Sequence, residues 1–243
     1  MATNTGGEGA DWDVERVGLG RHFLRDMESL WEEILKLAAV VENALSTSVR
    51  ALCEGRPELA AEVDQGEQAI DDWEVKIERE CLRILALHQP VASDLRRVAA
   101  VLKINSDLER MADLAAHIAK RARKLATEPN PVPIPARMET LGQEVLAEVH
   151  DALDALAKGD AALARAVIAS DRRIDLHRQA VVKELKQAIR REPQRVNTWL
   201  RLINTARNLE RVADHATNIA EDVVYLKEGD IIRHVGSHRQ QLA

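Results

Sequence analysis

Aromatic residues and turn-forming residues are scarce in this chain of 243 residues. Aromatic residues make up 2% of it, and there are only 11 glycines and 7 prolines. Strand-rich proteins depend on aromatic and β-branched side chains, whereas this chain relies on Ala, Leu, Glu and Arg, which favour helices. The composition therefore predicts an all-α fold, and a hydrophobic share of 46% is enough for a substantial core.

Other absences narrow the classes of function. There are two cysteines, Cys53 and Cys81, and no Cys-x-x-Cys pair, which suits buried thiols in a reducing cytoplasm. No stretch approaches 18 uninterrupted apolar residues, and residues 1–13 lack the apolar core of a signal peptide. The net charge of -6 gives no basic footprint for nucleic acid. We therefore expect a cytoplasmic protein that binds no nucleic acid.

Apolar residues recur at helical spacing over six segments, which glycine and proline separate. Four prolines within 127–135 exclude a helix there and indicate a semi-rigid linker over 127–136. Residues 1–16 and 236–243 are expected to be tails, the first of them disordered. The expected helices cover about 17–53, 57–88, 91–125, 137–158, 161–191 and 194–227.

The second half of the chain repeats the first. Residues 107–113 and 208–214 both contain Leu-Glu-Arg-x-Ala-Asp, and residues 41–45 align with 149–153. The matching positions shift only gradually along the chain, so the loop lengths differ while the helices persist. This duplication predicts two tandem three-helix bundles built from six long antiparallel helices, one over 17–126 and one over 137–235.

Acidic pairs with a spacing of four residues recur at matching places in the two halves. Side chains four apart on a helix share one face, and adjacent carboxylates repel unless they are protonated or bound to a cation. All-oxygen clusters suit hard cations, and the absence of any Glu-x-x-His argues against a ferritin-like di-iron centre. The predicted metal ligands are Glu67, Asp71, Glu109, Asp113, Asp171, Asp175, Glu210 and Asp214.

The sequence offers three more candidate ligands, and it also offers one structural alternative to metal binding. His117 and Asn218 follow Asp113 and Asp214 by one helical turn, and Glu221 lies a further turn along. The arginines that follow the glutamates, Arg110 and Arg211, offer the alternative that the acids form structural salt bridges instead of holding metal.

Several motifs together resemble the PhoU family of phosphate-uptake regulators. They are Gln89-Pro90-Val91-Ala92-Ser93-Asp94-Leu95-Arg96, the two Leu-Glu-Arg-x-x-Asp copies, Asn218-Ile219-x-Glu221, and residues 224–235, Val-Tyr-Leu-Lys-Glu-Gly-Asp-Ile-Ile-Arg-His-Val. The resemblance covers about residues 20–235. The chain departs from the family in having Ala112 and Ala213 where Gly is frequent, a change that a helix tolerates.

The resemblance implies a cytoplasmic, non-enzymatic regulator that restrains the phosphate-starvation response. Such a protein would link the ATPase of the phosphate ABC transporter to a membrane sensor histidine kinase, peripheral to the membrane complex. The resemblance also implies metal clusters on the acidic pairs, with Fe, Mn, Mg or Zn as candidates, and we expect a homodimer. Two other classes stay open: a metal-dependent helical-bundle phosphohydrolase or other metalloprotein, and a histidine phosphotransfer bundle.

Overall fold

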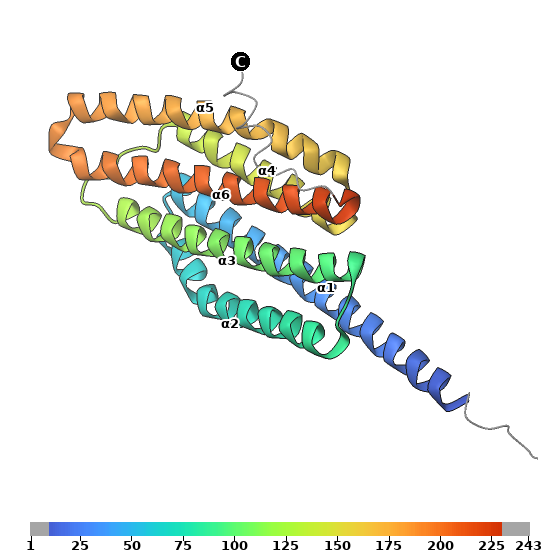
Figure 1. Ribbon diagram of the computed structural model, residues 1–243. Coiled ribbons are helices and arrows are strands. Elements are labelled where there is room, and N and C mark those ends of the chain that lie inside the picture. The colour runs from blue at the N-terminus through green and yellow to red at the C-terminus, as the bar shows by residue number, and fades with distance from the viewer. Residues whose placement is uncertain (1–9, 230–243) are drawn as a thin grey trace, which may run out of the picture.

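The computed structural model describes residues 10–229, and the side chains of residues 20–229. Within this range the chain forms six long helices and one three-residue 3-10 helix, and it forms no strand (Figure 1). The predicted all-α fold is confirmed. The helices are α1 (Ala10–Glu54), α2 (Pro57–His88), α3 (Ala92–Ala126), α4 (Ala136–Lys158), α5 (Ala161–Arg191) and α6 (Val196–Glu228), with the short helix η1 (Pro193–Arg195) before α6.

The helix ends follow local chemistry. Asp160 caps α5, because its side chain accepts hydrogen bonds from the backbone N–H groups of Ala162 and Leu163 at 2.9 and 3.0 Å. Gly159 and Gly229 end α4 and α6 in the left-handed conformation, with φ of 60° and 82°.

One predicted boundary is wrong. α1 begins at Ala10, so residues 10–16 of the predicted disordered tail are helical. The two glycines near its start, Gly18 and Gly20, each cost a helix only about 1 kcal/mol, which does not suffice to end it. Residues 230–243, including the predicted tail 236–243, lie outside the described residues.

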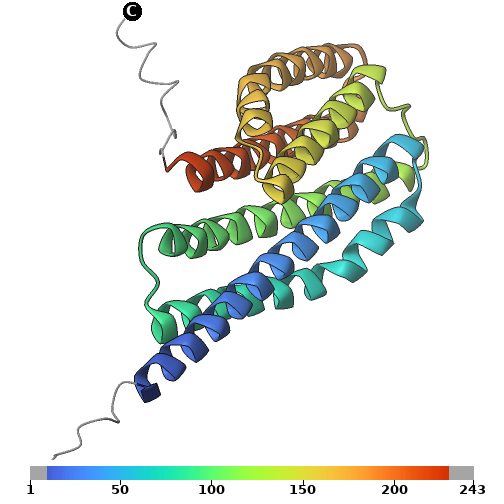
Figure 2. The same ribbon diagram turned by 90° about the vertical axis from the view of Figure 1, so that its right-hand side faces the viewer.

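The two predicted three-helix bundles lie side by side and share a long seam. α1, α2 and α3 pack together, α4, α5 and α6 pack together, and α3 lies against α6 in the middle of the molecule (Figures 1 and 2). α1 also contacts α4 across the seam. The central position explains why α3 and α6 bury 15 and 16 residues, whereas the outer helices α2 and α5 bury 7 and 6.

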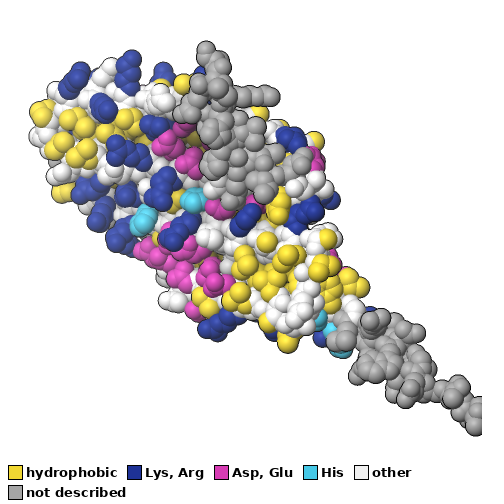
Figure 3. All heavy atoms as spheres, viewed as in Figure 1, with side chains coloured by type: hydrophobic (Ala, Val, Ile, Leu, Met, Phe, Trp, Pro, Cys, Tyr) yellow, Lys and Arg dark blue, Asp and Glu magenta, His cyan; other side chains and the backbone are white. Residues whose placement is uncertain are grey.

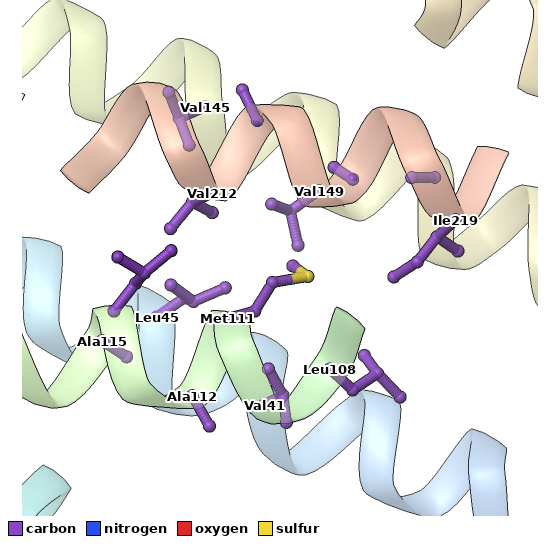
Figure 4. Close-up of a cluster of buried hydrophobic side chains, with 14 of the residues drawn as sticks. Val41, Leu45, Leu108, Met111, Ala112, Ala115, Val145, Val149, Val212 and Ile219 are labelled. Carbon is purple, nitrogen blue, oxygen red and sulfur yellow. The ribbon is translucent and has the colours of Figure 1, made fainter. Parts of the chain in front are cut away.

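A single hydrophobic core runs through both halves. At its centre lies Met111 of α3, whose side chain points toward Val149, with Val212 of α6 also close by (Figure 4). None of these three side chains is exposed to solvent. The halves are therefore not independent units joined by a linker, since each one completes the core of the other.

Contacts across the seam follow the duplication. Glu42 of α1 and His150 of α4 occupy equivalent positions in the two copies, and their side chains meet at 2.9 Å. Near them, a Cβ added at Gly142 would lie 2.9 Å from Cγ1 of Val49, so glycine permits the close approach of α1 and α4. Equivalent residues that touch each other indicate that an approximate twofold axis relates the halves.

The α3–α6 contact also carries polar links. The carboxylate of Asp107 accepts from the Nδ2 of Asn218 at 3.2 Å and lies 2.8 Å from Nδ1 of His215. Lys103 pairs with the buried Asp222 at 3.3 Å. Among residues 10–229 we find no helix that combines the length and the apolar character needed to cross a membrane.

Candidate metal centres

Acidic side chains gather in two places on the face shown in Figure 3, one over α2 and α3 and the other between α5 and α6. Each place combines acids from two neighbouring helices. The antiparallel packing of these helices brings the middle of one beside the middle of the other, where the acidic pairs stand in the sequence. In each half, two helices that carry predicted ligands therefore lie side by side.

In the second half the four predicted ligands come together. Partial desolvation and the carboxylates of Asp171, Glu210 and Asp175 raise the pKa of Asp214, whose side chain stays exposed at the surface, to about 6. Burial and Asp175 likewise raise the pKa of Asp171. The pKa of Glu210 is raised by burial, against the opposing effect of Arg178. α5 and α6 thus hold four carboxylates within range of mutual repulsion.

In the first half the gathering differs from the prediction at one position. The pKa of Glu109 is raised by burial, by Asp113, and by Glu74 and Asp71 from α2. Glu67 is exposed and is not among the groups that act on Glu109. Glu74, whose pKa burial and its acidic neighbours raise, occupies the place nearer to α3. The sequence signal for Glu74 was its membership of the acidic stripe of α2.

Arginine guanidinium groups stand among the acids in both halves. Arg110 lies 3.2 Å from Glu109 and 3.4 Å from Asp113. In the second half the arginine is Arg178 of α5, which bonds Glu210 and lies 3.9 Å from Asp175. The salt-bridge alternative therefore holds for Arg110, while Arg178 takes the role that the sequence suggested for Arg211.

The donor set fits a hard cation in its chemistry, although the side chains are not arranged as a finished site. Desolvation is the largest cause of the raised pKa values of Glu109 and Asp214, and repulsion from neighbouring carboxylates adds to it. A bound divalent cation would offset both effects. Across residues 20–229, no three His, Cys, Asp or Glu side chains converge closely enough to hold a metal ion. To bind a metal ion, the carboxylates would have to break their ion pairs with Arg110 and Arg178.

The additional ligand candidates fare differently. His117 is exposed on α3, one turn beyond Asp113. Asn218 donates to Asp107 across the seam, so its amide is already engaged with the other half. Glu221 is half-buried and makes an interaction of its own. Of these three candidates, only His117 has a side chain that could add a ligand to one of the acidic clusters.

One acidic residue beside the second cluster was missed. Glu148 of α4 is only 4% exposed, and burial, with a smaller contribution from Asp171, raises its pKa to about 7. One oxygen accepts from the hydroxyl of Ser170 at 2.7 Å, while the other has no hydrogen-bond partner. The sequence signal was a glutamate inside the apolar stripe of α4. The first half has Val40 at the matching position, so the two clusters differ.

Comparison with known proteins gives one consistent result. A family model described as "PhoU domain" matches residues 34–122 and again 138–223, one match in each half. The "Phosphate-specific transport system accessory protein PhoU homolog" of Pseudomonas putida is 37% identical over 91% of this chain and 86% of its own length.

Two crystal structures share the fold over most of their length. PhoU from Pseudomonas aeruginosa superposes with a TM-score of 0.81 at 35% identity, covering 86% of this chain and all of that one. The "phosphate transport system regulatory protein PhoU" from Streptococcus pneumoniae gives a TM-score of 0.78 at 30% identity, covering 86% and 98%. The likeness therefore extends to the packing of both halves.

Proposed function

The chain belongs to the PhoU family, and from this premise we propose that it is an accessory regulator of phosphate uptake and of the phosphate-starvation response. In this role it acts as an adaptor between the ATPase subunit of the phosphate ABC transporter and a sensor histidine kinase. It would work in the cytoplasm, peripheral to the membrane complex, and without catalysis of its own.

One observation carries the proposal. The PhoU domain model matches each half of the chain, and the two halves pack against each other, in a fold shared with relatives whose names give an accessory or regulatory role in phosphate transport. A rigid helical body with long polar faces suits simultaneous contact with two partners, because a helix face offers an extended docking surface.

A reporter experiment tests the regulatory role. We expect deletion of the gene to switch on a phosphate-starvation promoter in phosphate-rich medium, and the intact gene to restore repression. Tagged protein should recover the transporter ATPase and the sensor kinase from cell extracts. Unchanged reporter activity together with recovery of neither partner would overturn the proposal.

We also propose that the acidic clusters bind metal, with Fe, Mn, Mg or Zn as candidates. Glu109 and Asp113 would act with Asp71 and Glu74 in the first half, and the four clustered acids of α5 and α6 would act in the second. When bound, the metal would supply positive charge that holds neighbouring helices together. The support is the set of raised carboxyl pKa values in both halves.

The metal proposal is tested by elemental analysis of protein purified without chelator. A variant with Glu109, Asp113, Glu210 and Asp214 all changed to alanine should lose the metal and the gain in Tm on adding Mn²⁺. Arg178→Gln, which removes a competing cation, should instead tighten Mn²⁺ binding at the second cluster. Equal metal content in the quadruple variant would show that the ligands lie elsewhere.

The homodimer and the absence of catalysis stay predictions. Light scattering after size-exclusion chromatography measures the mass of the assembly, and a monomer at all concentrations would contradict the dimer. Hydrolysis of a phosphomonoester with Mn²⁺, abolished by Asp113→Ala, would instead favour the phosphohydrolase.

A further inference from the structure

A pocket of about 280 Å³ opens at one end of the seam between the two halves. Leu156 and Val223 are buried apolar residues in its wall, and Trp31 lies beside them. The pocket contains none of the predicted metal ligands and draws on both halves. Its lining comes from α1, α3, α4 and α6 and from the turn after α4: Trp31, Arg97, Leu156, Ala157, Lys158, Gly159, Val223, Leu226 and Lys227.

The charged side chains at this pocket are all cations, and two of them lack an acidic partner. Lys158 is neutralised by Asp154 at 2.7 Å. Within residues 20–229, neither Arg97 nor Lys227 forms an ion pair. The guanidinium of Arg97 lies 5.7 Å from the centre of the Trp31 ring, a cation–π contact. Two positive charges at a pocket without a matching acid create a positive potential that favours an anion.

Glycine shapes the rim on the side of Lys227. A Cβ added at Gly159 would lie 2.4 Å from Cε and 2.8 Å from Nζ of Lys227. The end of the Lys227 side chain therefore lies against the backbone of the α4 C-cap, beside the pocket that it lines. A larger residue at position 159 would displace it.

The duplication supplies a comparison at the other end of the seam. There Thr198, which occupies the position equivalent to Arg97, donates to Glu128 at 2.7 Å, and Arg201 bonds the same carboxylate. An acid from the linker thus satisfies the donors at that end. At the Arg97 end, the described residues that line the pocket include no acid.

We propose that this pocket binds a nucleotide. Its phosphate would lie between Arg97 and Lys227, because guanidinium and ammonium groups are the usual protein ligands of phosphate. Its base would lie against Trp31 and Leu226, the large apolar lining residues that keep exposed surface, since aromatic and apolar side chains provide stacking surfaces for nucleobases. The volume stands at the lower end of small-molecule sites, which favours a mononucleotide.

Binding at this place would connect the two halves. Trp31 and Arg97 belong to the first half, and Leu156 and Lys227 belong to the second. A ligand that contacts both would stabilise the packing of α3 on α6 and raise the Tm of the whole chain. Through this site an adaptor protein could respond to a phosphorylated metabolite. This biological use rests on the proposed function, whereas binding of the nucleotide does not.

Calorimetric titration of the full chain with AMP, in the presence of a chelator, tests the proposal. We expect one site per chain, and a loss of affinity of about tenfold or more in Arg97→Ala/Lys227→Ala. Lys183→Ala/Lys186→Ala removes the same charge from exposed positions of α5 and should leave the affinity unchanged. Thermal unfolding of both variants confirms that they are folded.

Comparison ligands separate the rival occupants. If the base stacks as proposed, Trp31→Leu should weaken the binding of AMP but leave the binding of inorganic phosphate unchanged. If inorganic phosphate bound as tightly as AMP, the assignment of a nucleotide as the ligand would be overturned. No binding of AMP to any form, or equal losses in the two double variants, would also overturn the proposal.

Discussion

The carboxyl group of Glu148 shows how one side chain can set the pH response of this fold. Its pKa rises from the ordinary 4.5 to about 7 because burial disfavours the charged form. Between these values the unfolded chain has lost a proton that the folded chain keeps. Stability therefore falls as pH rises through this window, and the full penalty persists above pH 7.

Replacing this glutamate should remove the penalty. We expect Glu148→Gln to be more stable than the parent at pH 8, by on the order of 2–3 kcal/mol, and nearly equal to it at pH 4. Urea unfolding at both pH values, with a chelator present, measures the difference. Glu62→Gln, at an exposed position on α2, is the matched control. An equal effect of Glu148→Gln at the two pH values would contradict this assignment.

Asp107 is the residue that links the halves most directly through polar contacts. Asp107→Ala leaves His215 and Asn218, both half-buried, without their shared acceptor. The expected loss is about 1–3 kcal/mol, because unsatisfied buried donors carry a desolvation cost. Chemical denaturation measures it. Asp151→Ala, an exposed acid of α4, should change stability little, and a similar loss there would show that general charge effects dominate.

At the scale of the helices, α1 and α4 can approach closely because Gly142 has no side chain. Alanine at position 142 would gain about 1 kcal/mol of helix propensity but would press on the stiff, β-branched Val49. We expect Gly142→Ala to be neutral or destabilising in the parent and stabilising in the Val49→Ala background. A double-mutant cycle gives the coupling energy, and strictly additive effects would show that the helices move apart freely.

For the molecule as a whole, the shared core predicts cooperative unfolding. Met111→Ala should cost about 2–5 kcal/mol, since the side chain is fully buried where the halves meet. Variants that keep only Trp73 or only Trp199 report on the first and second half. Both should unfold at one urea concentration and shift together with Met111→Ala. Separate transitions would mean that the halves are independent domains.

The prediction from sequence succeeded where local interactions decide. Helix ends fell within a few residues of their places, apart from the start of α1, because proline, glycine and capping residues act on their immediate neighbours. The acidic pairs of α5 and α6 lie near each other, since the four-residue spacing and the antiparallel packing together bring them side by side; their binding of metal stays a prediction.

The candidate site was predicted only in part. Choosing between Glu67 and Glu74 required the rotation of α2 about its axis, which depends on how its apolar stripe meets α1 and α3. Arg178 reaches Glu210 from the neighbouring helix, a contact that no spacing within one helix reveals. Glu148 carried no motif at all, and only its burial identifies it.

The sequence by itself determined that this protein consists of six helices in two related halves, because the helical spacing of its apolar residues and the repeat of its motifs are both visible without a structure. Only the tertiary structure decided that α3 and α6 lie against each other, because an apolar helix face does not specify which partner covers it. That packing forms the basic pocket beside Trp31, and the packing of α5 on α6 brings Arg178 to Glu210. Both features join residues far apart in sequence, so they depend on the relative rotation and position of whole helices.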